Sequence, residues 1–259
     1  MAKGVFSNSE IKQAIEDKQI IIYPYYEEEE EGEKSNDSID ENNNIKTKNN
    51  KGVVTKINTT SVDVRLGEHF FRINNSRDES TVFNPFSEAD VNKHFEQHRA
   101  RPLYQSLGQI SLSAVGGIPK EHPVIRLEAG ERILGHTYEF IGIARDGTSS
   151  MQARSTVGRS GINVCQDAGW GDCGYVNRWT MEIYNNNNHL VFLPVGMRIA
   201  QIVFYHSEGV ESEYSLDTGK YQNQSADNIE EIIAKWKPSD MLPKAYKDKI
   251  MPYKPLDCD

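Results

Sequence analysis

"RWTMEIYNNNNHLVFLPVGMRIAQIVFYH", residues 178–206, decides the fold class because it places several strand signals in one short stretch. Its apolar runs are separated by turn residues at Asn185–Asn188 and at Pro194–Gly196. In the first run Trp179, Met181 and Ile183 alternate with polar residues, which is the period of a β-strand. Short strands at such close spacing predict an all-β fold, either a barrel or a sandwich.

Strand signals continue upstream, with a few short helices between and after them. Further strands are predicted at residues 20–23, 59–73 and 124–143, the last with a turn at Ala129–Gly130. Short helices are predicted after Ser7 or Ser9, within residues 88–104 and at Ile229–Trp236.

A polar stretch interrupts this pattern early in the chain. Glu27–Lys51 carries nine acidic and four basic residues, and Ile39 and Ile45 are its only apolar side chains. Such a stretch buries too little apolar surface to offset the entropy of ordering it. We therefore predict a β domain over residues 1–226, with a disordered insertion at 27–52, an extra segment at 77–121, and a C-terminal extension at 227–259.

The overall charge limits the class of ligand. The 259-residue chain has a formal net charge of −9, which disfavours a general nucleic-acid binder because phosphate backbones need a basic face. A small anionic ligand needs only a local cationic pocket.

The sequence has no signal for a membrane span or for a disulfide-bonded protein. It contains no run of about 18 apolar residues, and its three cysteines are irregularly spaced and give no disulfide framework. We expect a cytoplasmic protein that binds neither nucleic acid nor membrane.

Three polar features that lie close together in the sequence predict the site. The segment "ARSTVGRSG" (153–161) is a polar loop with two arginines, and "DAGWGDCG" (167–174) is a glycine-rich turn with two carboxylates. On the strand "RWTMEI", the period places Thr180 and Glu182 on the face opposite Met181. If Met181 faces the core, Glu182 faces a cleft, where a raised pKa suits a general base.

Each feature also has a purely structural interpretation when it is taken alone. A strand glutamate is usually a solvated surface residue, and loops of this composition are often simple turns. An arginine of the loop could pair with Asp167 or Asp172. The combination of cationic donors, a backbone turn and a strand carboxylate favours a functional site.

Four motifs resemble those of a known family. In order and spacing, "ARSTVGRSG", "DAGWGDCG", "RWTMEIYN" and "PVGMRIAQIVF" are similar to segments of the dCTP deaminases of the trimeric dUTPase superfamily. "SVDVRLG" (61–67) and "GKYQNQ" (219–224) extend the resemblance over most of residues 5–225. The resemblance implies a distorted β-barrel of the dUTPase-like type and a homotrimer with sites between subunits. "CQDA" at 165–168 departs from the family pattern, which commonly has His-Val-Thr-Ala there.

The resemblance also assigns roles to individual residues. It implies that Glu182 transfers protons between the attacking water and the cytosine ring, and that Arg159 orients the catalytic groups. Ser155 and the carbonyl of Ala168 would position the water. Residues 154–159 would hold the triphosphate and shape the base site. Substrate contacts are implied for Arg154, Thr156, Val157, Gly158, Asp172, Thr180, Met181, Tyr214, Lys220 and Gln224. Asp172 would bind the deoxyribose, Thr180 and Met181 would meet the nucleobase through their backbone, and Lys220 and Gln224 would close over the phosphates.

The implied reaction is hydrolytic deamination of dCTP to dUTP, in which water attacks C4 of cytosine while N3 gains a proton. Zinc deaminases activate that water with a metal in an H-x-E…P-C-x-x-C frame, which this sequence lacks. A metal-free route needs a carboxylate base and fixed hydrogen bonds, so we expect no zinc. Mg²⁺ would be bound through the substrate triphosphate.

Three other functions stay open. "AGWGDCG" (168–174) resembles the version found in deaminases that also hydrolyse dUTP to dUMP, which suggests a bifunctional enzyme. A plain dUTPase is disfavoured, because such enzymes lack a strand glutamate that matches Glu182 and end in a glycine-rich loop that bears arginine. A non-catalytic nucleotide-binding trimer is the remaining alternative.

Overall fold

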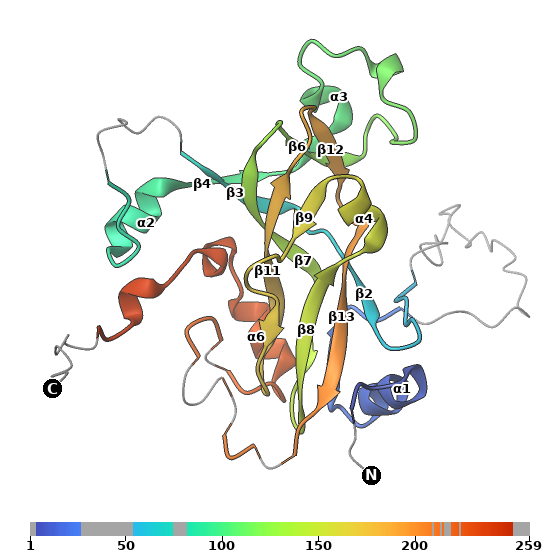
Figure 1. Ribbon diagram of the computed structural model, residues 1–259, viewed down its shortest axis with the longest axis vertical. Coiled ribbons are helices and arrows are strands. Elements are labelled where there is room, and N and C mark those ends of the chain that lie inside the picture. The colour runs from blue at the N-terminus through green and yellow to red at the C-terminus, as the bar shows by residue number, and fades with distance from the viewer. Residues whose placement is uncertain are drawn as a thin grey trace, which may run out of the picture.

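The computed structural model describes residues 4–26, 54–74, 82–208, 210–212, 214, 219–222 and 224–250. Within these residues, antiparallel strands form three sheets, accompanied by short helices (Figure 1). The predicted all-β class is confirmed, although the three sheets of the described part do not join into one closed barrel. The predicted disordered insertion at 27–52 lies outside the described residues.

The largest sheet carries the predicted base. It has six strands in the order β4 (Phe95–Arg99), β3 (His69–Ile73), β7 (Arg132–Ile143), β11 (Val176–Asn185) and β9 (Ile162–Val164), with β1 (Ile20–Tyr23) also paired to β7. In the β7–β11 register, Glu182 lies opposite Leu134, and Tyr184 lies opposite Arg132. Residues opposite each other in an antiparallel pair share a face, so Arg132 and Glu182 are on the same side of the sheet.

Two smaller sheets complete the β structure. The four-stranded sheet runs in the order β10 (Trp170–Gly171), β8 (Gly147–Ala153), β13 (Arg198–His206) and β2 (Val62–Arg65). The three-stranded sheet contains β12 (Val191–Pro194), β6 (Pro123–Leu127) and β5 (Arg101–Pro102). Strands that are neighbours in the sequence, such as β11, β12 and β13, therefore belong to three different sheets.

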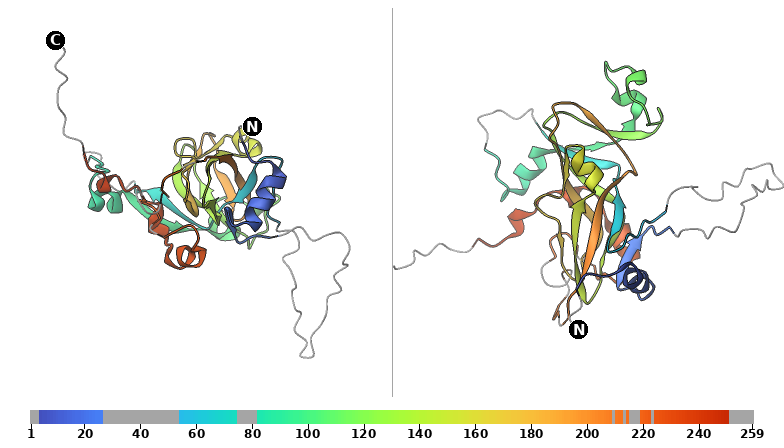
Figure 2. Two further views of the ribbon diagram at one scale, coloured as in Figure 1. Left: turned by 90° about the horizontal axis from the view of Figure 1, so that it is seen from below. Right: turned by 45° about the vertical axis from the view of Figure 1, so that its right-hand side comes forward.

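The helices are short and lie around the sheets (Figure 2). The α-helices are α1 (Asn8–Glu16), α2 (Glu88–His94), α3 (Leu103–Ser106), α4 (Ser155–Arg159) and α6 (Ile229–Lys235), and the 3₁₀ turns are η1 (Leu112–Ala114), η2 (Pro238–Met241) and η3 (Ala245–Lys247). Ser7 caps α1, and its side chain accepts a hydrogen bond from the Glu10 backbone N–H, so this predicted start is confirmed. No helix in the described part of the chain is long and apolar enough to cross a membrane.

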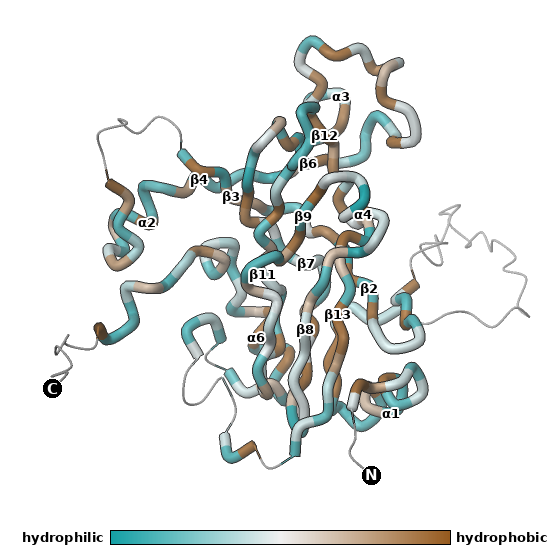
Figure 3. Tube along the Cα trace, in the orientation of Figure 1, coloured by the Kyte–Doolittle hydropathy of each residue, from teal (hydrophilic) through white to brown (hydrophobic). Residues whose placement is uncertain are grey.

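The main hydrophobic core fixes which way β11 faces. Trp179, Met181 and Ile183 are all buried in this core, between residues of β7, β8 and β13. Much of β13 is hydrophobic along its length (Figure 3). Because side chains alternate along a strand, Thr180 and Glu182 must face away from that core. The face predicted for Glu182 is therefore confirmed.

The single strand predicted over residues 59–73 is instead two strands in different sheets, β2 and β3. The chain passes between them at Gly67, whose N–H donates to the His136 carbonyl oxygen at 2.8 Å. A Cβ atom at this position would lie 2.0 Å from the His136 ring, so the crossing requires glycine. Asp63 and Arg65 of β2 are also buried, and each is paired with an opposite charge.

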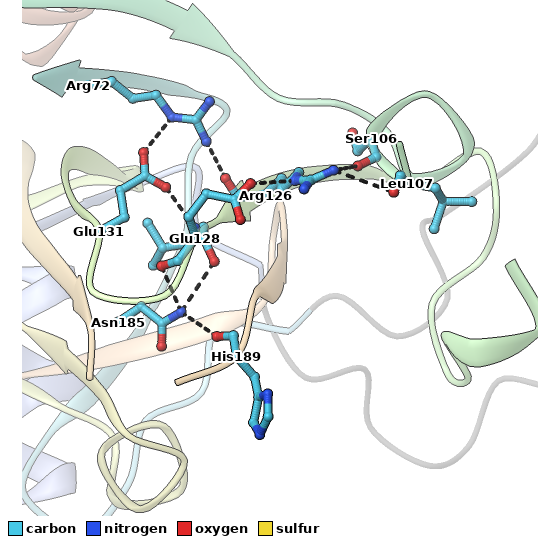
Figure 4. A network of polar contacts seen from close by, with 9 residues as sticks. Arg72, Ser106, Leu107, Arg126, Glu128, Glu131, Asn185 and His189 are labelled. Carbon is cyan, nitrogen blue, oxygen red and sulfur yellow. Dashed lines mark hydrogen bonds and ion pairs between the residues drawn. The ribbon is translucent and has the colours of Figure 1, made fainter. Parts of the chain in front are cut away.

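The end of β11 is fixed by a buried asparagine. Asn185 donates from Nδ2 to three backbone carbonyl oxygens, those of Leu127, Glu128 and His189, at 3.2, 2.9 and 2.9 Å (Figure 4). These bonds join the end of β11 to the end of β6 and to the turn before β12. The asparagine of the "RWTMEIYN" motif therefore has a structural role that a nonpolar residue could not fill.

The extra segment and the C-terminal extension pack together beside the large sheet, where Figure 1 shows α2 and the C-terminal segment side by side. Val91 of α2, Phe71 of β3 and Met241 and Leu242 of the extension share one buried cluster. The predicted helix at 229–236 is confirmed as α6, whose Ile232 is buried against β7 and β11. The division at residue 226 stays a prediction.

Candidate active site

A cavity of about 590 Å³ lies over the face of β7 and β11 that turns away from the main core. Five of the predicted site residues line it: Ala168, Asp172, Thr180, Glu182 and Tyr214. They come from the glycine-rich turn, from β11 and from the segment after β13. The fold therefore brings together residues that are up to 46 positions apart in the sequence.

Glu182 is half-buried in this cavity. Its Oε2 atom is buried and has no hydrogen-bond partner among the residues that the structure describes. Burial raises the pKa of the Glu182 carboxyl, and the nearby Asp167 charge raises it further. Arg132 acts in the opposite direction and lowers this pKa. A carboxylate with a raised pKa and a free buried oxygen is suited to take a proton from a bound water.

Arg132 is a site residue that the sequence did not reveal. It lines the cavity, and its guanidinium lies 3.8 Å from the Asp167 carboxylate. The only sequence signal was the strand period, which places Arg132 on one face of its strand. Its position next to Glu182 depends on the β7–β11 register, which links residues about fifty positions apart.

The glycine-rich turn fits closely against the core side of β11. A Cβ atom at Gly171 would lie 2.4 Å from the Trp179 ring, so a larger residue would push the turn away from the sheet. The backbone N–H of Cys165 donates to the Glu182 carbonyl oxygen at 3.1 Å. The "CQDA" segment is thus attached to the strand that carries the predicted base.

Aromatic and apolar side chains form most of the remaining cavity wall, and the sequence did not predict this wall. Four of the apolar ones come from the extra segment and the C-terminal extension: Phe83, Phe95, Met241 and Pro243. The Phe83 ring stacks on His94 with a centroid distance of 3.9 Å. Trp170 is exposed and also lines the cavity. Helix signals at 88–104 predicted part of the element but not its position over β3.

The segment interpreted as a polar loop, "ARSTVGRSG", is mostly the short helix α4. Ser155, Thr156, Gly158 and Arg159 are exposed, and none of them lines the cavity in this chain. Val157 is buried in the core, so the substrate contact predicted for it cannot come from its side chain. The first turn of a helix exposes polar residues and buries one apolar residue, which is what this composition provides.

Arg154, which precedes α4, is held by a buried carboxylate. Its Nε lies 3.2 Å from Oδ2 of Asp63, and Arg198 approaches the same oxygen at 3.1 Å. The side chain of Asp63 is 1% exposed. The alternative in which this arginine pairs with Asp167 or Asp172 is therefore wrong. The Asp63 carboxylate therefore ties the residue that precedes α4 to β2.

The other predicted contacts lie elsewhere. The Met181 side chain is in the core, so only its backbone reaches the face predicted to meet the base. Lys220 and Gln224 line a second cavity of about 440 Å³, which meets the first at Tyr221.

No group of three or more His, Cys, Asp or Glu residues in the described ranges is arranged to hold a metal ion. The expected absence of zinc stays a prediction.

Comparisons with known proteins agree with these motifs. A family model described as "dCTP deaminase-like" matches residues 5–207. A protein of Methanopyrus kandleri named "dCTP deaminase, dUMP-forming" is 30% identical, over 84% of this chain and 90% of its own length. A protein of Nanoarchaeum equitans with the same name is 28% identical, over 90% and 98%. A 2′-deoxycytidine 5′-triphosphate deaminase from Agrobacterium tumefaciens aligns with a TM-score of 0.47 at 15% identity, over 80% of this chain and 49% of that one.

The family model covers both the strand that carries Glu182 and the segment that carries Arg159. The chain belongs to the dCTP deaminase-like family.

Proposed function

We propose that this chain catalyses the hydrolytic deamination of dCTP, with Glu182 as the proton-transfer group. One observation carries the proposal: Glu182 places a buried oxygen without a partner in a cavity that also contains Asp172 and Thr180. The names of the relatives in Methanopyrus kandleri and Nanoarchaeum equitans support dCTP as the substrate. A plain dUTPase is less favoured, because its reaction at phosphorus gives Glu182 no role.

The proposed reaction uses Glu182 twice. Its carboxylate takes a proton from water, and the resulting hydroxide attacks C4 while N3 of cytosine is protonated through the same group. The tetrahedral intermediate then passes its O4 proton to the 4-amino group, which leaves as ammonia. The C4=O bond forms, and N3 keeps its proton, which gives the uracil ring. A raised pKa helps, because the group must both accept and return a proton near neutral pH.

The cationic and hydroxyl groups of α4 would reach this cavity from another copy of the chain. Ser155 and Arg159 are exposed and lie outside the cavity of their own chain. We therefore propose that the chain forms a homotrimer whose active sites lie at subunit contacts. In each site, Ser155 and the Ala168 carbonyl would position the water, and Arg159 would orient the catalytic groups. Mg²⁺ would enter with the triphosphate.

A second reaction is favoured by one further residue. Asp172 lines the same cavity as Glu182 and could activate a second water for attack on the α-phosphate, which would release pyrophosphate and leave dUMP. The two relatives are named dUMP-forming. We propose this bifunctional activity as the alternative outcome.

Product analysis separates these functions. The full chain is incubated with dCTP or with dUTP and Mg²⁺, and dUTP, dUMP and pyrophosphate are quantified. dUTP alone from dCTP supports the deaminase, and dUMP with pyrophosphate from dCTP supports the bifunctional enzyme. In that case Asp172→Asn should block dUMP formation while ammonia release continues. dUMP from dUTP but not from dCTP would mean a dUTPase, and no product from either would favour a binding protein.

A further inference from the structure

The second cavity, of about 440 Å³, is unusually rich in lysine. It lies between the C-terminal extension, α2 and the residues Lys220, Tyr221, Gln222 and Gln224. Five lysines line it: Lys220, Lys235, Lys237, Lys244 and Lys247. Its lining contains two carboxylates, Glu88 and Asp240, and several side-chain amides, including those of Asn177 and Gln222. In a chain with a net charge of −9, this is a local concentration of positive charge.

Part of this positive charge has no carboxylate partner. Lys220 pairs with Asp248, Lys235 pairs with Glu231, and Lys244 lies 3.5 Å from Asp240. Lys237 and Lys247, which are exposed at the rim, form no ion pair with any residue in the described ranges. The cavity therefore offers two cations that are available to a ligand.

Lys244 is placed deeper and is held in position. Its side chain is 13% exposed, and Nζ donates to the Lys220 carbonyl oxygen at 3.1 Å. Nζ also lies 5.0 Å from the centre of the Tyr221 ring. Burial lowers the pKa of the Lys244 ammonium, Asp240 opposes this by raising the pKa, and the charges of Lys247 and Lys237 lower it. An anion among these three ammonium groups would relieve their mutual repulsion.

The floor of this cavity is rigidly attached to β11. Gln222 is buried; its Oε1 accepts from the Val176 N–H at 2.8 Å, and its Nε2 donates to the Gly174 carbonyl oxygen at 2.8 Å. Asn177 donates to the Tyr221 carbonyl oxygen at 3.1 Å. Tyr221 also lines the first cavity, so a ligand in one cavity lies next to a ligand in the other.

The two cavities have opposite charge. Among the residues that the structure describes, Arg132 is the one lysine or arginine that lines the first cavity, which also contains the carboxyl groups of Asp172 and Glu182. It therefore suits a base and sugar better than a polyphosphate. The second cavity provides the cations that the first one lacks.

We propose that the C-terminal extension builds an anion site in which Lys237, Lys244 and Lys247 bind the phosphate oxygens of a polyphosphate. The choice of a polyphosphate over other anions rests on the proposed function, because a nucleotide in the adjacent cavity would carry one. The polyphosphate is either the tail of the nucleotide in the first cavity or a separate molecule. Both sources present the same phosphate oxygens to the same lysines.

Calorimetry with inorganic tripolyphosphate tests the site on the full chain. The variant Lys237→Gln/Lys247→Gln should bind tripolyphosphate about tenfold more weakly than the unmodified chain, since it removes two exposed charges from the cavity. The matched control is Lys93→Gln/Lys249→Gln, which removes the same charge from exposed positions outside the cavity and should bind as the unmodified chain does. Equal affinity in both double variants would overturn the proposal.

Two further measurements identify the source and keep this proposal separate from the deaminase. If the site holds the nucleotide tail, tripolyphosphate should compete with dCTP, and the Lys237→Gln/Lys247→Gln change should weaken dCTP binding but not deoxycytidine binding. If it holds a separate anion, tripolyphosphate should bind with dCTP already present. Glu182→Gln should retain tripolyphosphate binding, so a failure of the proposed chemistry would leave the anion site intact. Loss of tripolyphosphate binding in Glu182→Gln would count against a separate site.

Discussion

β11 and α4 carry the two charged groups that the sequence assigned to one reaction, and the fold places them in different environments. Glu182 of β11 is half-buried, faces a cavity and has a buried oxygen without a partner in the described residues. Arg159 of α4 is exposed and lies outside that cavity. β11 is paired on both sides in the largest sheet, with β7 and with β9, whereas α4 is a five-residue helix between β8 and β9.

Under the proposed function, one chain holds the proton-transfer group in its own cavity, whereas Arg159 of the same chain does not reach that cavity. The position of Glu182 depends only on its own chain, because β7, β9 and the core fix β11. The position of Arg159 relative to a substrate depends on a neighbouring copy, if the predicted homotrimer forms. Changes in the two elements should therefore behave differently when subunits are mixed.

The largest effect is expected from Glu182→Gln. Glutamine keeps the shape of the side chain but cannot take a proton from water, so kcat for dCTP deamination should fall on the order of 10²–10⁴-fold. Nucleotide binding should be largely kept, because the cavity walls are unchanged. Steady-state kinetics and calorimetry with dCTP measure the two quantities. The control is Glu121→Gln, an exposed glutamate outside the cavity. Normal turnover in the Glu182 variant would reject it as the base.

Arg159→Ala is expected to have the next largest effect. Loss of a charged donor that becomes desolvated in the assembled site should cost at least ~3 kcal/mol of transition-state stabilisation, measured as kcat/KM. The variant should fold normally, since Arg159 is exposed in the single chain. A kcat/KM equal to that of the unmodified enzyme would show that α4 is not part of the site.

Subunit mixing then sharpens the comparison. When Glu182→Gln and Arg159→Ala chains are unfolded together and reassembled, some contacts will join an intact β11 of one chain to an intact α4 of another. Activity should return in the mixture if the site lies between copies. If both groups act within one chain, the mixture should stay as inactive as its components.

The fold was predictable wherever a local pattern decides the structure. The alternation of Trp179, Met181 and Ile183 predicted β11 and its buried face, and Ser7 predicted the start of α1. Strand pairing was not predictable, because β11, β12 and β13 follow one another in sequence but pair with distant strands. The break at Gly67 depends on the His136 ring, which lies in another strand far along the chain.

The same distinction applies to the site. Motif resemblance pointed to Glu182, Asp172 and Ala168, which the fold does bring to one cavity. Arg132 and Asp63 were missed because their roles come from cross-strand and inter-sheet neighbours. The aromatic wall was missed because it depends on how the extra segment packs against the C-terminal extension. Neither the extra segment nor the C-terminal extension has a sequence pattern that predicts which part of the chain it packs against.

Asp63→Asn should have a moderate effect and tests how α4 is held. Asparagine keeps the size of the side chain but removes the buried charge that pairs with Arg154 and Arg198. The free energy of unfolding should fall by about 1–3 kcal/mol. The loss should not be larger, because both arginines are partly exposed and water can solvate them after the pair is broken. KM for dCTP should rise as Arg154 loses its fixed position. Chemical denaturation and steady-state kinetics measure these changes, and an unchanged KM would mean that Arg154 does not contact the substrate.

The smallest expected effect is a shift in pH dependence, and it tests the charges around Glu182. The base must be deprotonated, so kcat/KM should fall as the pH drops through the pKa of Glu182, and this acid limb should lie above the ordinary value of 4.5. Arg132 lowers that pKa, so Arg132→Gln should move the limb to higher pH. Asp167 raises it, so Asp167→Asn should move the limb to lower pH.

Both shifts should be less than about one pH unit, because Arg132 and Asp167 are largely exposed and water screens their charges. The double variant should return the limb close to its original position, since the two changes act in opposite directions on the same carboxylate. Arg145→Gln, an exposed arginine outside the cavity, provides the control for a change in net charge. If the two single variants move the limb in the same direction, the limb belongs to another group, and the proton-transfer role of Glu182 loses its electrostatic support.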